Sequence, residues 1–385
     1  MSEPGSLARR FRQSLLKWYD DQRRDLPWRR TRDPYAIWLS EIMLQQTTVR
    51  TVEPRWTRFL QRFPTVKALA AAPLDDVLHE WTGLGYYARA RNLHRAATIV
   101  ARDFDGELPA SHELLLALPG MGVYTAAAVA SIAFGEVVPV LDANVERVVA
   151  RLLALEENAR MPSAKRAIRA HLEHLIDPAR PGDFNQAMME LGATVCSPKS
   201  PGCSRCPVAG ACRGRALGEP ENYPRLPPKA PLEEVREVAV VLRKGRHILL
   251  LQRPATGSFA GMWELPRGTC NPGEDGPEAA ARIVREQTSL EATPRSPLLR
   301  LQHTVMRRRI ELTVFDTSSW SGVPRAITHE RLEWTLPEEW LDLPKSTTQA
   351  DIAAHLAGKP TKKARRAPAP SDDEGAPPDL FDPEP

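Results

Sequence analysis

Four of the chain's five cysteines lie inside one 17-residue segment, and this spacing constrains the fold more than any other feature of the sequence. The segment follows a C-x6-C-x2-C-x5-C pattern, and its cysteines are Cys196, Cys203, Cys206 and Cys212. Four thiols so close in sequence, with prolines stiffening the loops between them, can converge on one metal centre. An iron–sulfur cluster is favoured over zinc, because zinc ribbons usually pair two C-x2-C knuckles and this segment has one. Disulfides are a third interpretation, which we do not expect in a chain without an export signal.

The spacing of apolar residues predicts two folded domains of different class. From Leu7 to about Leu191 apolar residues recur at helical intervals, which predicts an all-α domain over residues 1–215. Residues 236–355 carry short runs typical of strands around one helical segment, and they predict an α+β domain. The expected strands and helix are Val235–Leu242, His247–Gln252, Glu311–Phe315 and the helix Pro277–Gln287.

Proline marks the segments that we expect to stay outside these domains. Five of the 36 prolines fall in residues 216–235, which predicts an extended linker. Residues 356–385 form a low-complexity stretch that cannot bury enough apolar surface to fold, so we expect a disordered tail.

The formal charge of +4 is unevenly distributed along the chain. Residues 1–215 hold 29 Lys and Arg against 23 Asp and Glu, whereas the two later segments are close to neutral. A basic domain suits a polyanion such as nucleic acid, although a solvated basic face has the same composition. No stretch approaches the roughly 20 uninterrupted apolar residues of a membrane span, so we expect a cytoplasmic protein.

A glycine turn, Leu118-Pro119-Gly120-Met121-Gly122-Val123, separates two helical runs. Its glycines let backbone N–H groups at the start of the second helix point toward an anion, where the helix dipole also favours negative charge. Alone, such a turn is most often an ordinary helix connection. Beside the cysteine segment it predicts a sequence-independent phosphate contact made by Gly120, Gly122 and Val123.

The turn followed by the four cysteines resembles the endonuclease III superfamily of DNA glycosylases, and further motifs narrow the resemblance to the adenine DNA glycosylases of the MutY type. The resemblance is dense over residues 7–215 and looser over 235–345. The motifs that carry it are Leu26-Pro27-Trp28-Arg29, the run from Trp38 to Thr47, Gly83-Leu84-Gly85-Tyr86-Tyr87, Leu141-Asp142-Ala143-Asn144-Val145 and Phe184-Asn185-Gln186.

The resemblance implies the cofactor, the partner and the setting of the protein. It implies a helix-hairpin-helix domain with a [4Fe-4S] cluster on the four cysteines, and a Nudix-like C-terminal domain. The implied partner is double-stranded DNA with adenine opposite 8-oxoguanine or guanine. We therefore expect a monomeric base-excision repair enzyme associated with a bacterial nucleoid.

Glu41 is the candidate general acid. It lies in the predicted helix Tyr35–Val49, whose apolar residues cover nearly every face, so its carboxyl group is expected to be desolvated. Desolvation raises the pKa of a carboxyl group and keeps a proton available near neutrality, as a general acid requires. The alternative is a buried glutamate neutralised by an arginine. By resemblance, Glu41 would protonate adenine N7 and turn the base into a leaving group.

Asp142 precedes the helical run after residue 143, and from the residues alone it is a helix N-cap. By resemblance, its carboxylate would also stabilise the oxocarbenium charge on the deoxyribose or trap it covalently. The two roles are compatible.

Position 124 distinguishes two related reactions. Glycosylases of the superfamily that also cut the strand have a lysine here, which forms a Schiff base with the sugar. Tyr124 therefore predicts a monofunctional glycosylase, in which Tyr124 and Asn144 are polar partners of Asp142. The rival function is an endonuclease III-like glycosylase and lyase for oxidised pyrimidines. A mismatch-binding protein without chemistry would need Glu41 or Asp142 to be lost.

The target base must leave the helical stack to be reached. By resemblance, Trp28, Arg29 and Gln186 would line its pocket, while Gln46 and Tyr86 would enter the duplex near the opposite base. From the residues alone, Trp28 and Tyr86 are equally well explained as core or surface aromatics.

The second domain lacks the acids of an active Nudix hydrolase. The Nudix signature can be laid from Gly268 through Glu274 and Arg282, but Ile283 and Gln287 replace two of the three acids that follow. A divalent-metal site needs several carboxylates. We therefore expect this domain to recognise DNA without hydrolysing nucleotides.

In the family that the chain resembles, this domain reads 8-oxoguanine through a Phe-Ser-His loop. The matching loop here is Val305-Met306-Arg307, followed by two more arginines. We expect Arg307 and Arg308 to contact DNA, since arginine forks bind phosphates and guanine edges. We also expect weaker discrimination between 8-oxoguanine and guanine than is usual in the family.

Two features remain outside the predicted chemistry. The acidic tail carries an isolated Leu380-Phe381 pair that could dock on a partner such as a replication clamp, and a solvated tail without a partner is the alternative. Cys270 lies far from the other cysteines and is expected to be structural.

Overall fold

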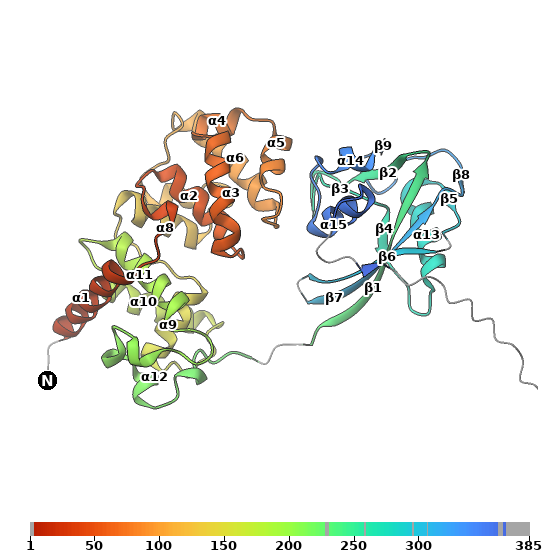
Figure 1. The fold of residues 1–385 in the computed structure, drawn as a ribbon. Coiled ribbons are helices and arrows are strands. Elements are labelled where there is room, and N and C mark those ends of the chain that lie inside the picture. Colours follow the sequence, from red (N-terminus) through yellow and green to blue (C-terminus); the bar gives the residue numbers. More distant parts are fainter. Residues whose placement is uncertain are drawn as a thin grey trace, which may run out of the picture. The chain divides into compact units, whose positions relative to one another are not determined.

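The computed structural model of the chain describes residues 4–227, 231–257, 259–294, 296–305, 307–360 and 365–366. Backbone contacts divide the chain into two compact units, residues 1–230 and residues 231–385. We call them unit 1 and unit 2 and describe each by itself (Figure 1). Met306 of the predicted lesion loop and the predicted docking pair Leu380-Phe381 lie outside the described residues.

Unit 1 is helical wherever the structure describes regular elements in it, which confirms the class predicted from the spacing of its apolar residues. Its helices are α1 Pro4–Gln22, α2 Pro34–Leu44, α3 Val49–Arg62, α4 Val66–Ala71, α5 Leu74–Glu80, α6 Ala88–Asp103, α7 His112–Leu116, α8 Val123–Phe134, α9 Ala143–Leu153, α10 Pro162–Leu175, α11 Pro181–Thr194 and α12 Arg213–Ala216. Figure 1 shows two groups of helices, α2–α6 with α8 and α1 with α9–α12. The groups meet where α8 packs against α11, so residues on these two helices can face one site.

Helix α2 is apolar around its whole circumference, and its residues 35–43 are all buried. A polar side chain on this helix is therefore removed from water, as predicted for Glu41. The predicted helix over Tyr35–Val49 is too long. Helix α2 ends at Leu44 because Gln45 has a non-helical ψ of 112° and Gln46 then adopts a positive φ of 56°, in the left-handed region.

Residues 216–227 differ from the extended linker that their prolines predict. Tyr223 is only 2% exposed, and its carbonyl accepts a hydrogen bond from Arg151 Nε at 3.0 Å. The Ala159 amide donates to the Arg225 carbonyl at 3.1 Å. A buried aromatic ring thus holds this segment on unit 1, and periodicity could not reveal it because it is a single anchor.

Unit 2 contains a mixed sheet with strand order β10-β6-β7-β1-β2-β3, in which β4 also pairs with β1 and β9 with β2. The strands are β1 Glu233–Lys244, β2 His247–Gln252, β3 Trp263–Glu264, β4 Arg267–Thr269, β6 Pro297–Val305, β7 Arg308–Thr317, β9 Arg331–Thr335 and β10 Arg365–Arg366, and a separate pair is formed by β5 Glu291–Ala292 and β8 Trp320–Ser321. Strands β1 and β7 are parallel, and the other pairs are antiparallel. The three predicted strands are confirmed inside β1, β2 and β7.

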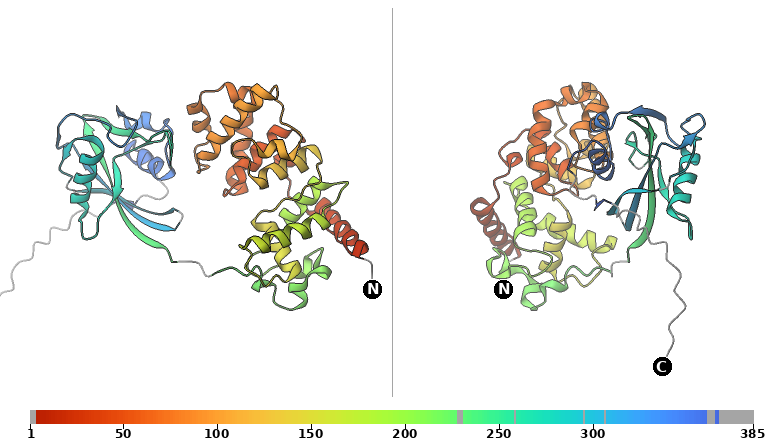
Figure 2. Two further views of the ribbon diagram at one scale, coloured as in Figure 1. Left: turned by 180° about the vertical axis from the view of Figure 1, so that it is seen from behind. Right: turned by 45° about the vertical axis from the view of Figure 1, so that its right-hand side comes forward.

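Helices cover both faces of this sheet (Figure 2). Alternate residues of β1 point to opposite faces. Val238 and Val240 pack with α13 Gly276–Thr288, whereas Ala239 packs with α15 Thr347–Leu356. A third helix, α14 Pro337–Trp340, precedes α15. The predicted helix Pro277–Gln287 is confirmed as α13, and the α+β class of the domain is confirmed with it.

Candidate active site

Glu41 and Tyr124 form a buried hydrogen-bonded pair between α2 and α8. Glu41 is 5% exposed, and the Tyr124 hydroxyl donates to its Oε2 at 2.5 Å. The glycine turn determines this position, because α8 begins at residue 123 directly after Gly122 and Tyr124 is its second residue. The same hydroxyl lies 3.4 Å from Met189 Sδ on α11, so the pair lies where the two helix groups meet.

The pKa of the Glu41 carboxyl group is raised to about 7, and desolvation is the main cause. The hydrogen bond from Tyr124 lowers this pKa, nearby Asp142 raises it, and the charge of Arg29 lowers it. A large fraction of Glu41 therefore carries a proton near neutral pH, which is what general acid catalysis needs.

Asp142 is the N-cap of α9, as its position before a helical run predicts. Its Oδ1 accepts from the Val145 amide at 2.7 Å, and its Oδ2 accepts from Asn144 Nδ2 at 2.9 Å. Both oxygens are thereby held in one orientation. Asn144 is placed beside Asp142 as predicted, but the Tyr124 hydroxyl donates to Glu41 instead of Asp142, because α8 packs on α2.

A second carboxylate, Glu190, was not predicted from the sequence. It lies on α11 with a side chain that is 0% exposed, and it forms ion pairs with Arg24 at 2.7 Å and Arg29 at 2.8 Å. Burial alone would raise its pKa, but the hydrogen bonds from the two arginines hold the pKa at about 2. The available signal was a carboxylate four residues after Gln186 in a mostly apolar helix, the same signal that identified Glu41.

Of the predicted base-pocket residues, Trp28 and Gln186 are buried and Arg29 is half-buried. Trp28 is 6% exposed and packs edge-to-face on Trp56, with ring centroids 6.0 Å apart, so its ring belongs to the core. Gln186 is buried on α11, and the Arg29 side chain is 10% exposed. Of the three, Arg29 acts on Glu41 through its charge.

Gln46 and Tyr86, predicted to enter the duplex, lie on two exposed loops. Both adopt positive φ values, 56° and 45°, and Tyr86 is 57% exposed. Arg89 joins the two loops, since its Nη2 donates to the Leu84 carbonyl at 2.8 Å and to the Thr47 hydroxyl at 3.2 Å. The loops are thus fixed to each other while the two side chains stay accessible.

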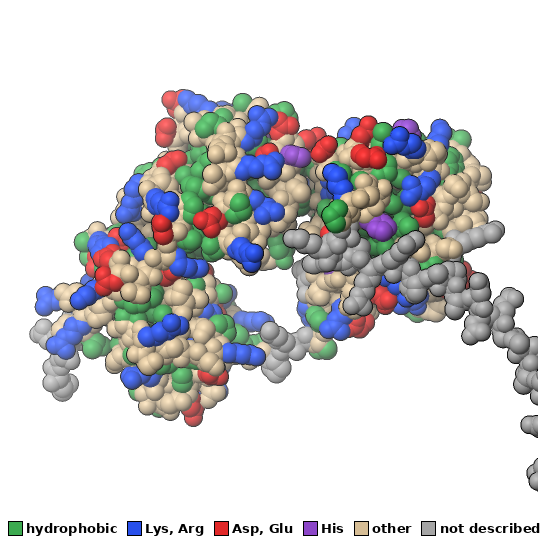
Figure 3. Space-filling view, in the orientation of Figure 1, with side chains coloured by type: hydrophobic (Ala, Val, Ile, Leu, Met, Phe, Trp, Pro, Cys, Tyr) green, Lys and Arg blue, Asp and Glu red, His purple; other side chains and the backbone are tan. Residues whose placement is uncertain are grey.

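The glycine turn of the predicted phosphate contact is open to solvent at Gly122 and Val123. Gly120 has a φ of +76°, and a Cβ there would lie 2.7 Å from Asn92 Cβ, so glycine is required. Around Gly122 nothing would meet an added Cβ within 4 Å, and Val123 is exposed. Figure 3 shows Lys and Arg side chains spread over the visible face of unit 1, not gathered in one stripe. The turn is therefore a more specific indication of an anion site than the charge distribution.

The four predicted metal ligands of residues 196–212 line one cavity and form no disulfide. Arg151 lies beside them, and its Nη1 donates to Cys196 Sγ at 3.2 Å. Arg147 connects this loop to the catalytic region, because its Nε donates to the Cys196 carbonyl at 2.8 Å and its Nη2 to Asn144 Oδ1 at 3.0 Å. The donor set of four cysteines fits an iron–sulfur cluster.

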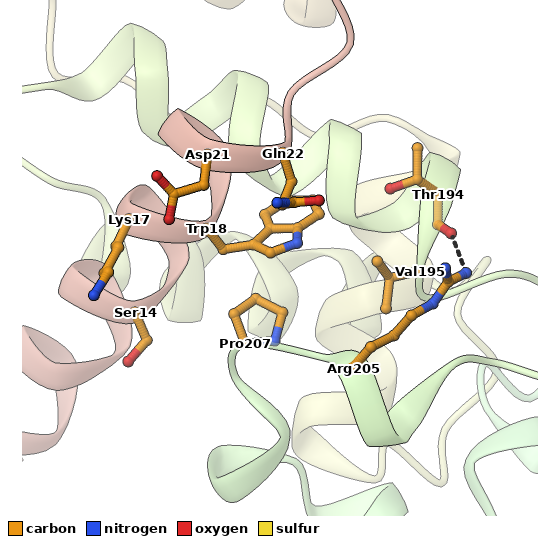
Figure 4. A pocket seen from close by; sticks show the side chains of 9 residues that line it. All are labelled: Ser14, Lys17, Trp18, Asp21, Gln22, Thr194, Val195, Arg205 and Pro207. Carbon is orange, nitrogen blue, oxygen red and sulfur yellow. Dashed lines mark hydrogen bonds between the residues drawn. The ribbon is translucent and has the colours of Figure 1, made fainter.

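A wider groove lies between α1 and the cysteine loop (Figure 4). Trp18 and Pro207 form its walls, and Arg205 closes one end by donating to the Thr194 carbonyl at 3.1 Å. None of the residues that line this groove is a predicted catalytic or base-binding residue. It is therefore not the candidate base pocket.

In unit 2 the two substituted Nudix positions have structural roles. Ile283 is 2% exposed and packs on Gly268. The Gln287 side chain accepts from the Arg267 amide at 3.1 Å and donates to its carbonyl at 2.8 Å. An apolar residue and an amide thus occupy positions where a hydrolase has the carboxylates that bind a divalent metal.

The predicted DNA-binding arginines of unit 2 flank the start of β7. Arg308 forms an exposed ion pair with Glu233 at 3.1 Å, and Arg309 forms one with Glu234 at 2.8 Å, across the parallel β1–β7 pair. Arg307 precedes β7 and is exposed. Exposed pairs of this kind contribute little to stability, so Arg308 can exchange its carboxylate for a phosphate.

Comparison with known proteins agrees with this geometry. Residues 39–178 match the family of HhH-GPD superfamily base excision DNA repair proteins, and residues 237–355 match the NUDIX domain family. The chain is 36% identical to the adenine DNA glycosylase of Homo sapiens, over 89% of this chain and 73% of that protein. It is 46% identical to the adenine DNA glycosylase of Mycolicibacterium smegmatis, over 54% of this chain and 70% of that protein. A thermostable thymine-DNA glycosylase has a similar structure, with a TM-score of 0.52 and 29% identity, covering 56% of this chain and all of that one.

The sequence matches extend across both units, and the buried acid, the capped aspartate and the cysteine loop occur together in unit 1. In the described part of the chain, no helix is long and apolar enough to span a membrane. The chain therefore belongs to the adenine DNA glycosylase family of base excision repair enzymes.

Proposed function

We propose that this chain hydrolyses the N-glycosidic bond of adenine mispaired with 8-oxoguanine or guanine in double-stranded DNA. The observation that carries the proposal is the buried Glu41–Tyr124 pair beside the capped carboxylate of Asp142. Glu41 can protonate a leaving base, and the Asp142 carboxylate places a fixed negative charge near the sugar.

The reaction needs one proton and one water. Glu41 donates its proton to N7 of the adenine, the bond between C1′ and N9 breaks, and its electron pair leaves with the base. The Asp142 carboxylate then stabilises the positive charge at C1′, or adds to C1′ as in retaining glycosidases. Water attacks C1′, and its proton returns to Glu41. Tyr124 stabilises the intermediate Glu41 carboxylate through its hydrogen bond.

Tyr124 supports a monofunctional enzyme. Burial and the neighbouring Glu41 raise the pKa of its phenol well above the ordinary value, so the hydroxyl keeps its proton and remains a donor. A phenol cannot form a Schiff base with the opened sugar, which is the step that leads to strand cleavage. We therefore propose that the strand stays intact after base loss.

Unit 1 offers groups for an extruded adenine and for the duplex around it. Arg29 and Gln186 would bind the base edge, with Trp28 packed behind them in the core, and the exposed Gln46 and Tyr86 would enter the duplex. The open turn at Gly120, Gly122 and Val123 would bind phosphate through backbone amides.

The cysteine loop would hold a [4Fe-4S] cluster through Cys196, Cys203, Cys206 and Cys212, and the iron and sulfide content of the purified protein tests this. When bound, the cluster supplies a rigid covalent brace for the loop. Arg147 and Arg151 bind the backbone and sulfur of Cys196 from α9, so the loop is fixed relative to the helix that Asp142 caps.

Unit 2 would recognise the base opposite the adenine. Arg307 and Arg308 supply charge for this contact, but no Ser/His pair is present in the loop, which supports weaker selectivity for 8-oxoguanine over guanine. The Leu380-Phe381 segment is proposed to bind a replication clamp, and a DNA substrate would locate the protein at the nucleoid of a bacterial cell.

Incubation with labelled duplexes that differ only in the mispair tests the function. We expect cleavage at adenine opposite 8-oxoguanine or guanine, only after alkali, and no cleavage of a duplex with an oxidised pyrimidine. Cleavage without alkali, or a protein–DNA adduct trapped by borohydride, would instead support the glycosylase and lyase.

A further inference from the structure

Glu190 holds Arg29 close to the general acid without touching the acid itself. Its carboxylate accepts four hydrogen bonds: from the Arg24 amide at 3.1 Å, from Arg24 Nε and Nη2 at 2.8 and 2.7 Å, and from Arg29 Nη2 at 2.8 Å. Arg29 Nη1 donates to the Arg24 carbonyl at 3.1 Å, and its guanidinium lies 5.6 Å from the ring centroid of Tyr19. Arg29 is thus fixed by groups from α1, α11 and the segment between α1 and α2.

Arg29 is the cation that acts on Glu41. The other groups acting on Glu41 are Tyr124 of α8 and Asp142 at the start of α9. From α6, Arg89 approaches α2 but donates to the carbonyls of residues 42 and 43. From α3, the side chain that bonds to α2 is the neutral Trp56, through the Ala36 carbonyl. A guanidinium beside a carboxyl group favours its ionised form, and an ionised Glu41 has no proton to donate.

We propose that Glu190 is a positioning residue that neutralises Arg29 and keeps its guanidinium from pairing with Glu41, so that Glu41 retains its proton for catalysis. This inference rests on the proposed adenine glycosylase function. Arg29 then remains available to the base edge without acting as the partner of the acid. The sequence left open the alternative that Glu41 is a buried glutamate neutralised by an arginine. In the structure the nearby arginine, Arg29, is paired with Glu190 instead.

The test is the pH dependence of the single-turnover rate of adenine release by the full chain. Wild-type rates should fall as pH rises through the pKa of Glu41, since only its protonated form donates. In Glu190→Gln the charge of Arg29 is no longer neutralised, so this decline should move to lower pH by about one unit. In Arg24→Gln one of the two cations paired with Glu190 is lost, so the net charge of this cluster falls from +1 to 0 and the decline should move to higher pH.

Two further variants separate positioning from folding. Glu190→Asp keeps the carboxylate and should return the decline toward its wild-type position. Glu80→Gln is the matched control, because it removes another carboxylate paired with an arginine in unit 1, Arg58 at 2.7 Å, and should leave the profile in place. If Glu190→Gln does not fold, the Arg24→Gln shift still tests the proposal.

The inference is overturned if Glu190→Gln lowers the rate equally at every pH, or if Arg24→Gln leaves the decline in place or moves it in the same direction as Glu190→Gln. Failure of the underlying function looks different, because wild type would then release no adenine or Glu41→Gln would keep the full rate.

Discussion

At the scale of single residues, two buried glutamates have pKa values shifted in opposite directions. Glu41 and Glu190 are both buried glutamates in helices, yet the pKa of Glu41 is raised to about 7 and that of Glu190 is lowered to about 2. Desolvation acts on both, and the two arginines on Glu190 reverse its effect there. The partners of a carboxylate therefore decide whether it serves as an acid or as a fixed anion.

The raised pKa of Glu41 predicts a pH-dependent change in stability. Because its folded pKa exceeds the ordinary value of 4.5, the protonated form is favoured in the folded state, and this contribution is lost as pH rises toward 7. The free energy of unfolding of wild type should therefore fall between pH 4.5 and pH 8, whereas Glu41→Gln has no group that titrates at this position. Over this range the free energy of unfolding of Glu41→Gln should rise by about 3 kcal/mol relative to that of wild type. Urea denaturation across this range measures the gain, with the exposed Glu113→Gln as control. If the difference in unfolding free energy between Glu41→Gln and wild type stays constant with pH, burial does not raise the pKa of Glu41.

At the scale of elements, the sequence was sufficient where periodicity extends over many residues. The helical class of unit 1, the strand β2 and the helix α13 follow from the repeat of apolar positions. The end of α2 could not be predicted in this way, because Gln46 has no sequence signature of a left-handed residue and no proline or glycine interrupts residues 45–49. The loop is fixed by Arg89, which lies more than forty residues away, at hydrogen-bond distance from the Ile42 and Met43 carbonyls.

Arg89 is therefore predicted to hold both loops that we propose to approach DNA. Arg89→Gln leaves several loop and helix-end acceptors without their donor, and it should lower stability by about 2 kcal/mol. Loops that are free to move must be ordered on binding, so affinity for a mismatched duplex should fall about tenfold. Thermal melting and fluorescence anisotropy measure the two effects, with the exposed Arg95→Gln on the same helix as control. Unchanged DNA affinity in a variant that still folds would show that the loops are fixed without Arg89.

At the scale of the whole molecule, the predicted classes of both units are confirmed, whereas contacts between distant segments were beyond the sequence. Arg24 and Glu190 are 166 residues apart, and no local pattern pairs them. The same holds for Tyr223, whose burial on unit 1 replaces part of the predicted linker. Tyr124 was expected to be a partner of Asp142, but its hydroxyl donates to Glu41, because helix packing determines the direction of a side chain.

If unit 2 recognises the base opposite the adenine, as proposed, lesion selectivity is a property of unit 2. Replacing Val305-Met306-Arg307 by Phe-Ser-His should raise the ratio of adenine release opposite 8-oxoguanine to release opposite guanine. The rate opposite guanine should change little, because the catalytic residues lie in unit 1. Single-turnover assays on the two duplexes measure the ratio. An unchanged or lower ratio would refute the assignment of selectivity to this loop.

The central claim is that Glu41 is the acid that releases adenine. The most direct measurement is the single-turnover rate of adenine release from a duplex with adenine opposite 8-oxoguanine, for wild type, Glu41→Gln and the control Glu80→Gln. A glutamine cannot donate the proton, so the rate of Glu41→Gln should fall by a factor of about 10² to 10⁴ while Glu80→Gln stays near wild type. A Glu41→Gln rate equal to wild type would contradict the account.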